Sequence, residues 1–205
     1  VALTLPVAGP TTKPAESAAT GATRLTLRAW LVVIGSATMA MAGLSVFVIS
    51  GSWLNDEFGV STGGLGLIVM GFGAFELIAS GGSAALADRI GKMRSALGGL
   101  VVLTCGLLVM LSADGRLAIG VIGILMLLIG FEYGFVTSLS LVSEAMPEAR
   151  GSTLAVGNAV GTLARGSGTI LSGWLYGIHG ISGPAALSAA AAVAAATCFV
   201  LSRRF

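Results

Sequence analysis

Residues 81–94 read Gly-Gly-Ser-Ala-Ala-Leu-Ala-Asp-Arg-Ile-Gly-Lys-Met-Arg, and they separate two long apolar segments that carry almost no charge. Four charged side chains fall within seven positions of this stretch: Asp88, Arg89, Lys92 and Arg94. Gly91 lies among them, and glycine lets the backbone turn sharply between two helices. The pattern predicts a short loop at a membrane surface, although a charge cluster alone fits a solvated turn of any six-helix membrane protein equally well.

The composition indicates an integral membrane protein. Of the 205 residues, 10% are charged and 55% are hydrophobic, and the mean hydropathy is +0.96. A water-soluble domain of this length needs a more strongly charged exterior. Cys105 and Cys198 both lie inside apolar runs, so we expect free thiols and neither a disulfide, a metal site nor a cofactor.

Six apolar segments follow an opening stretch rich in proline, threonine and serine. Each is near the ~20 residues that a helix needs to cross ~30 Å of hydrocarbon. The predicted spans are roughly 29–50, 62–86, 95–112, 117–143, 151–177 and 182–202. We therefore expect an all-α membrane protein, with a cytoplasmic linker at 1–28 and a six-helix transmembrane domain at 29–205.

The basic residues predict the orientation of these spans. Nine of the eleven lysines and arginines fall on one side, one falls on the other side, and Arg165 lies inside a span. The side that is richer in lysine and arginine is usually cytoplasmic. We expect a multi-pass protein of the plasma membrane with both termini in the cytoplasm, and with the loops near Asp56 and His179 facing outward.

Two segments carry a resemblance to the major facilitator superfamily. Leu86-Ala-Asp-Arg-Ile-Gly-Lys92 resembles the family pattern G-x-L-a-D-r-x-G-r-k between the second and third helices of each half, although Ala84 replaces its opening glycine and Met93 replaces a base. Glu144-Ala-Met-Pro-Glu-Ala-Arg-Gly151 resembles the pattern E-x-x-P-x-x-x-R-G between the fourth and fifth helices, and is one residue shorter.

The resemblance implies a gate, because in the family the charges of these two loops hold the cytoplasmic side shut. Carried over by position, the gate would consist of Asp88, Arg89, Gly91, Lys92, Arg94, Glu144, Arg150 and Gly151. The alternative is that these charges only anchor helix ends, with Pro147 ending one helix and Arg150 beginning the next.

The fifth span indicates which half of such a transporter the chain would be. It lacks the Gly-Pro pair that marks the antiporter signature of first halves, so the resemblance implies the C-terminal half, with an inverted three-plus-three repeat of helices. The opening stretch resembles the tail of the central loop, and we expect a fragment whose partner is the missing N-terminal six-helix half. Gly157, Gly161, Gly166 and Gly168 predict close helix packing in this span.

Three ionisable residues lie deep in the predicted spans: Glu76, Glu132 and Arg165. At ~1.5 Å per residue, both acids lie ~18 Å and the arginine ~22 Å from the cytoplasmic surface, where carriers of this kind bind substrate and coupling ions. If Arg165 pairs with one acid, the other becomes a candidate proton site. We favour Glu132, because the resemblance implies that its helix lines the cavity, and because three aromatic residues lie near it, at positions 131, 133 and 135. The alternative is one structural pair and one solvated acid.

The resemblance implies a secondary transporter, not an enzyme, that moves a small organic solute by alternating access with coupling to protons, similar to efflux permeases. Its partners would be the solute, protons, the other half and the lipid bilayer, with no nucleic acid. One alternative is a self-contained six-helix homodimeric scaffold or channel. A more remote one is a rhomboid-like protease with Ser167 as nucleophile, which the distant position of His179 disfavours. Substrate, direction of transport and oligomeric state stay open.

Overall fold

The computed structural model describes residues 24–205, except for the side chains of residues 78–88. Most of the predicted linker therefore lies outside the described residues. The first helix begins at Leu27, where the Thr26 hydroxyl accepts a hydrogen bond from the Ala29 amide over 3.2 Å. The elements are α1 Leu27–Phe58, α2 Thr62–Ile90, α3 Lys92–Leu111, α4 Leu117–Glu144, η1 Pro147–Ala149, α5 Arg150–His179, α6 Ser182–Leu201 and η2 Ser202–Arg204.

Each of the six predicted spans is found as one helix, and the described part of the chain contains no strand. The prediction of an all-α membrane protein is confirmed. By length and composition, α1, α3, α4 and α6 are apolar enough to cross a membrane, whereas α5 has 30 residues but is more polar. The first span is longer than predicted, because α1 continues to Phe58 and so places Asp56 and Glu57 in its last turn instead of a loop.

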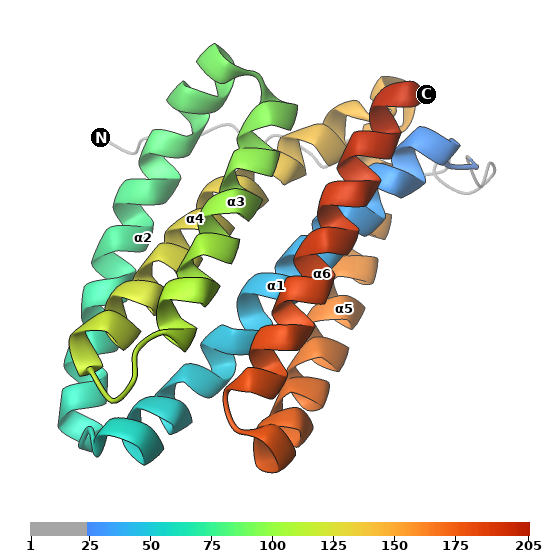
Figure 1. Ribbon diagram of the computed structural model, residues 1–205. Coiled ribbons are helices and arrows are strands. Elements are labelled where there is room, and N and C mark those ends of the chain that lie inside the picture. The colour runs from blue at the N-terminus through green and yellow to red at the C-terminus, as the bar shows by residue number, and fades with distance from the viewer. Residues whose placement is uncertain (1–23) are drawn as a thin grey trace, which may run out of the picture.

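Successive helices run in opposite directions, so the charged segments gather at one end of the molecule (Figure 1). We call this the basic end; it carries Arg89, Lys92, Arg94, Arg150 and Arg203. The connection between α2 and α3 is the single residue Gly91, with φ of 95°. A residue with a side chain rarely adopts such an angle, which confirms the predicted sharp turn at this glycine.

The first three helices and the last three have a similar order of lengths and a similar packing, but the two sets run in opposite directions. Helices α1, α2 and α3 have 32, 29 and 20 residues, and α4, α5 and α6 have 28, 30 and 20. Helices α2 and α3 pack against α4, while α5 and α6 pack against α1 (Figure 1). Because α1 runs away from the basic end and α4 runs toward it, this packing is that of the predicted inverted three-plus-three repeat.

Helices α3 and α4 approach each other backbone to backbone through glycines. A Cβ atom added to Gly106 would lie 2.4 Å from the Leu127 nitrogen, and one added to Gly130 would lie 2.3 Å from the Leu103 nitrogen. Only glycine permits such an approach, and close van der Waals packing of this kind holds helices together in lipid. The contact was not anticipated from the sequence.

The glycines that were predicted to pack closely lie in α5, and the structure corrects part of that prediction. A Cβ atom on Gly168 would lie 2.7 Å from Met41 Cγ, and one on Gly157 would lie 3.1 Å from Val142 Cγ1. Around Gly161 and Gly166, in contrast, no described atom apart from the adjoining backbone of α5 itself lies within 4 Å of an added Cβ. For these two residues the close approach is not found within this chain: Gly161 is buried but lines a small cavity between α1, α4 and α5, and Gly166 is exposed.

Serine hydroxyls form hydrogen bonds between the central helix α1 and three other helices. Ser36 on α1 and Ser138 on α4 share a buried hydrogen bond of 2.8 Å. Ser188 on α6 donates to the Ala42 carbonyl over 2.6 Å, and Ser172 on α5 donates to the Ser45 carbonyl. Such interhelical bonds are worth ~0.6 kcal/mol on average in a membrane, so together they specify how the helices pack.

Candidate functional site

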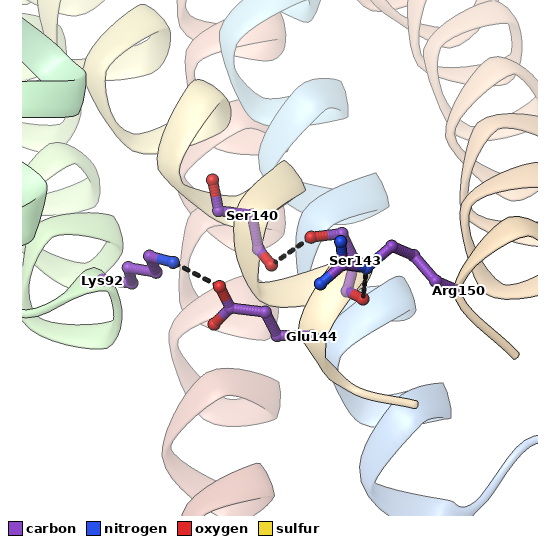
Figure 2. Close-up of polar contacts among 5 residues, drawn as sticks. All are labelled: Lys92, Ser140, Ser143, Glu144 and Arg150. Carbon is purple, nitrogen blue, oxygen red and sulfur yellow. Dashed lines mark hydrogen bonds and ion pairs between the residues drawn. The ribbon is translucent and has the colours of Figure 1, made fainter. Parts of the chain in front are cut away.

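The residues that were predicted to form a gate lie at the basic end. Lys92, at the beginning of α3, forms an ion pair with Glu144, at the end of α4 (Figure 2). Their side chains are 33% and 46% exposed, so water screens the pair and it contributes little to folding stability. Its geometric effect is to join the two charged segments, which lie 52 residues apart in sequence.

Arg150 ties the beginning of α5 to the same helix end. Its Nε donates to the Ser143 carbonyl over 3.2 Å, and the Ser143 hydroxyl donates to the Ser140 carbonyl over 2.8 Å (Figure 2). The last carbonyls of a helix lack intrahelical partners, so the bond from Arg150 gives the Ser143 carbonyl a partner. Lys92, Glu144 and Arg150 thus connect α3, α4 and α5 through the end of one helix.

The remaining predicted gate residues contribute in different ways. Gly91 forms the turn, while Arg89, Arg94 and Gly151 are exposed at the basic end. The Asp88 side chain lies outside the described residues. The structure therefore brings part of the predicted set together, and the gating role of the whole set stays a prediction.

Arg203 was not included in the predicted gate. Residues of α3, α4 and the C-terminus line a cavity of about 530 Å³ at the basic end, and Arg203 lies there with Lys92, Arg94 and Glu144. Arg203 is far along the chain from the two charged segments, and it reaches them only because α6 lies beside α3. The sequence shows that residue 203 is basic, but no local pattern indicated that its side chain would lie beside the two charged segments.

The two acids within the spans come together. Glu76 on α2 and Glu132 on α4 are both half-buried, and their carboxyl groups lie close enough to interact electrostatically. They meet because α2 packs against α4. Like charges repel in a medium of low dielectric constant, and a proton or another cation relieves that repulsion. A proton-coupling role for the two acids stays a prediction.

Arg165 lies in a different part of the structure. Its guanidinium donates to the Thr162 hydroxyl over 3.1 Å, and it lines a cavity of about 10 Å³ between α1, α4 and α5, together with Ser36 and Phe135. Neither acid lines that cavity. A cooperative role for Arg165 with the two acids stays a prediction.

The aromatic neighbours of Glu132 take separate positions. Phe131 and Phe135 stack with ring centroids 5.3 Å apart, and Phe131 packs against Gly43 of α1. The Tyr133 hydroxyl is buried and has no hydrogen-bond partner among the described residues. Only Phe135 reaches the cavity that holds Arg165, so the three rings do not form one lining.

A family model of the Major Facilitator Superfamily matches residues 10–204. The chain belongs to the major facilitator superfamily. The predicted family is thereby confirmed, and the chain is a multi-pass membrane protein of a transporter superfamily. A comparison with curated proteins found no match.

A second side-chain contact lies at the end opposite the basic end. The Tyr176 hydroxyl on α5 donates to Asp56 Oδ2 on α1 over 2.8 Å. This bond and the Lys92–Glu144 pair lie at opposite ends of the helix set and join different helices.

Proposed function

We propose that the chain is the C-terminal half of a secondary transporter that moves a small organic solute across the plasma membrane by alternating access, with coupling to protons. The observation that carries the proposal is the placement of Glu76 and Glu132 on two helices, α2 and α4, that pack against each other within a chain of a transporter superfamily. Placing a charge at the bilayer centre costs ~2.5–3.5 kcal/mol on insertion scales, so two acids there need a functional reason.

Proton coupling follows from the electrostatics of the acid pair. With both groups ionised, their repulsion favours binding of a proton, and a cationic solute or a rearrangement of the helices would favour its release. Solute binding or helix movement would thereby be linked to release of the proton from the acid pair. Glu132 is the preferred proton site and Glu76 its electrostatic partner. Arg165 would bind or orient the solute from α5.

A second six-helix half would complete the solute pathway. The cavity at Arg165, at about 10 Å³, holds no more than about one water molecule and is too small for an organic solute. The side of α5 that carries Leu163, Ile170 and Trp174 is apolar, and these side chains are 74%, 78% and 62% exposed. A facing half would cover this surface and enclose a larger cavity.

The charged network at the basic end would close one side of that pathway. When the Lys92–Glu144 pair and the Arg150 contact are formed, the beginnings of α3 and α5 are held at the end of α4. The pair is weak because it is partly exposed, so a rigid-body movement of the helices can break it at low cost. The basic end would face the cytoplasm, as would both termini.

The test starts with finding a solute. The protein is purified with the chain joined to the six-helix segment preceding it in the reading frame, and organic cations, sugars and amino acids are screened for a rise in melting temperature. A solute that stabilises the protein is then followed into proteoliposomes with and without an imposed pH gradient. Accumulation that needs the gradient supports the proposal.

Proteoliposomes that contain only the 205-residue chain provide the comparison. We expect no uptake by the chain alone, because the pathway needs two halves. Uptake by the chain alone would instead favour a homodimer, in which the exposed apolar side of α5 meets a second copy. Equal uptake with and without the pH gradient would contradict proton coupling.

A further inference from the structure

An apolar groove runs along the outside of the helix set between α3 and α6. It has a volume of about 310 Å³ and is lined by α3 residues that include Leu97, Val101 and Cys105, and by α6 residues that include Val193 and Ala196. Its one hydroxyl, on Thr104, donates to the Leu100 carbonyl over 2.8 Å. Apart from this hydroxyl and the Cys105 thiol, the side chains that line the groove are hydrocarbon, and those from α6 include two small alanines.

The groove leads to the basic cavity along one side of each helix. On α3, Met93 lines the basic cavity, and Leu97, Val101 and Cys105 follow at intervals of four residues, which places all four on one face. Ala196 on α6 and Arg203 on η2, which directly follows α6, are seven residues apart, which is about two turns. The two cavities are thus consecutive parts of one surface, and α3 and α6 stand side by side in Figure 1.

The basic cavity has an excess of positive charge. Lys92, Arg94 and Arg203 line it with one acid, Glu144, so the lining carries three positive charges and one negative charge, or +2. The one ion pair found among the described side chains is Lys92–Glu144, so neither Arg94 nor Arg203, both exposed, is ion-paired with a described acid. The first turn of α3 also has no side-chain cap, and uncapped helix N-termini attract anions.

The dimensions match one leaflet of a bilayer. Leu97 is five residues and Cys105 thirteen residues beyond Lys92 along α3, which corresponds to depths of ~8 Å and ~20 Å. Half of the ~30 Å hydrocarbon core lies in each leaflet. A lipid whose headgroup lies at Lys92 would therefore have an acyl chain at the depth of the groove.

We propose that this surface is a binding site for an anionic phospholipid, with the phosphate at Lys92, Arg94 and Arg203 and one acyl chain in the groove between α3 and α6. The site lies on the outside of the helix set and goes beyond the proposed transport function. Positive charge selects an anionic headgroup, and the apolar groove selects a lipid over a soluble anion.

The test measures lipid binding to the purified protein by native mass spectrometry. Phosphatidylglycerol is titrated against phosphatidylcholine with the same acyl chains, and inorganic phosphate is the soluble competitor. We expect phosphatidylglycerol to bind about thirtyfold more tightly than phosphatidylcholine, since each base near an anionic lipid contributes ~1 kcal/mol and the lining has a net charge of +2. Arg203→Gln should weaken phosphatidylglycerol binding about fivefold, which corresponds to one such base.

Two matched controls distinguish the site from general effects. Arg116→Gln removes an exposed base at the opposite end and should leave lipid binding unchanged. Ala196→Phe fills the groove and should weaken binding of both lipids, whereas Ala194→Phe, at an exposed position of α6 outside the groove, should not. The proposal would be overturned if the two lipids bound with equal affinity, or if inorganic phosphate displaced the lipid fully. It would also be overturned if Arg203→Gln and Ala196→Phe both bound lipid as the wild type does.

Discussion

Lys92, the first residue of α3, is ion-paired with Glu144, the last residue of α4. Each residue comes from one of the two charged segments that were identified in the sequence, and the pair therefore joins those segments in space (Figure 2). Glu144 is also the neighbour of Ser143, whose carbonyl accepts from Arg150. The end of α4 is thus the point through which α3 and α5 are connected.

Reversing the charge of Glu144 should change the balance between the closed and open forms of the basic end more than it changes the free energy of unfolding. Glu144→Lys places two positive charges together, which should favour opening of the basic end and alter transport turnover. Because both side chains are partly exposed, the free energy of unfolding should change by only ~0–1 kcal/mol. Turnover and melting temperature are measured in parallel. The double variant Lys92→Glu with Glu144→Lys restores opposite charges and should recover turnover; if it is as impaired as Glu144→Lys, the pair does not act as a gate.

The gathering of bases at one end predicts which end faces the cytoplasm. Cysteines are introduced singly at Glu148, at the basic end, and at Ser112, at the opposite end, after replacing Cys105 and Cys198 by serine. Both positions are exposed. A membrane-impermeant maleimide added to intact cells should label Ser112→Cys and leave Glu148→Cys unlabelled. The protein without cysteines provides the background, and the reverse labelling pattern would invert the topology.

The backbone contact between α3 and α4 predicts that a methyl group added at one of its glycines lowers the stability of the protein. In Gly130→Ala the new Cβ would lie 2.3 Å from the Leu103 nitrogen, so the two helices must separate. Overpacking of this kind costs about 1–3 kcal/mol, and we expect a lower melting temperature in detergent. Gly98→Ala is the matched control on α3, because no atom lies within 4 Å of its added Cβ. Identical melting temperatures for the two variants would show that this contact is not tight.

Much of the fold follows from the sequence, because each span reads as one long apolar segment with charges or glycine at its ends. The turn at Gly91 is an example: its neighbours define the loop, and the glycine itself permits the angle. Boundaries were less accurate where polar residues continue a helix, as at Asp56 in the last turn of α1. Helix ends depend on local capping, which the span pattern does not contain.

The contacts between helices were harder to predict. Glycines occur in every span, and only the packing decides that Gly130 touches a neighbouring backbone while Gly161 does not. The same holds for the candidate site. The depths of Glu76 and Glu132 could be counted along the chain, but their proximity depends on α2 lying against α4. Arg203 reaches the basic cavity for a similar reason.

The acid pair is the part of the account on which proton coupling depends. Glu132→Gln keeps the size and hydrogen-bonding capacity of the side chain while removing its charge and its ability to exchange a proton. We expect this variant to lose uptake driven by a pH gradient and to retain solute exchange, which needs no net proton movement. Glu76→Gln should show a weaker form of the same effect, because it removes the neighbouring charge.

The most direct measurement is uptake of the stabilising solute into proteoliposomes with an imposed pH gradient, compared among wild type, Glu132→Gln and Glu76→Gln, with solute exchange recorded on the same vesicles. The account predicts that the gradient drives accumulation only in proteins that keep Glu132, while exchange continues in all three. Accumulation with unchanged dependence on the pH gradient in both variants would contradict it.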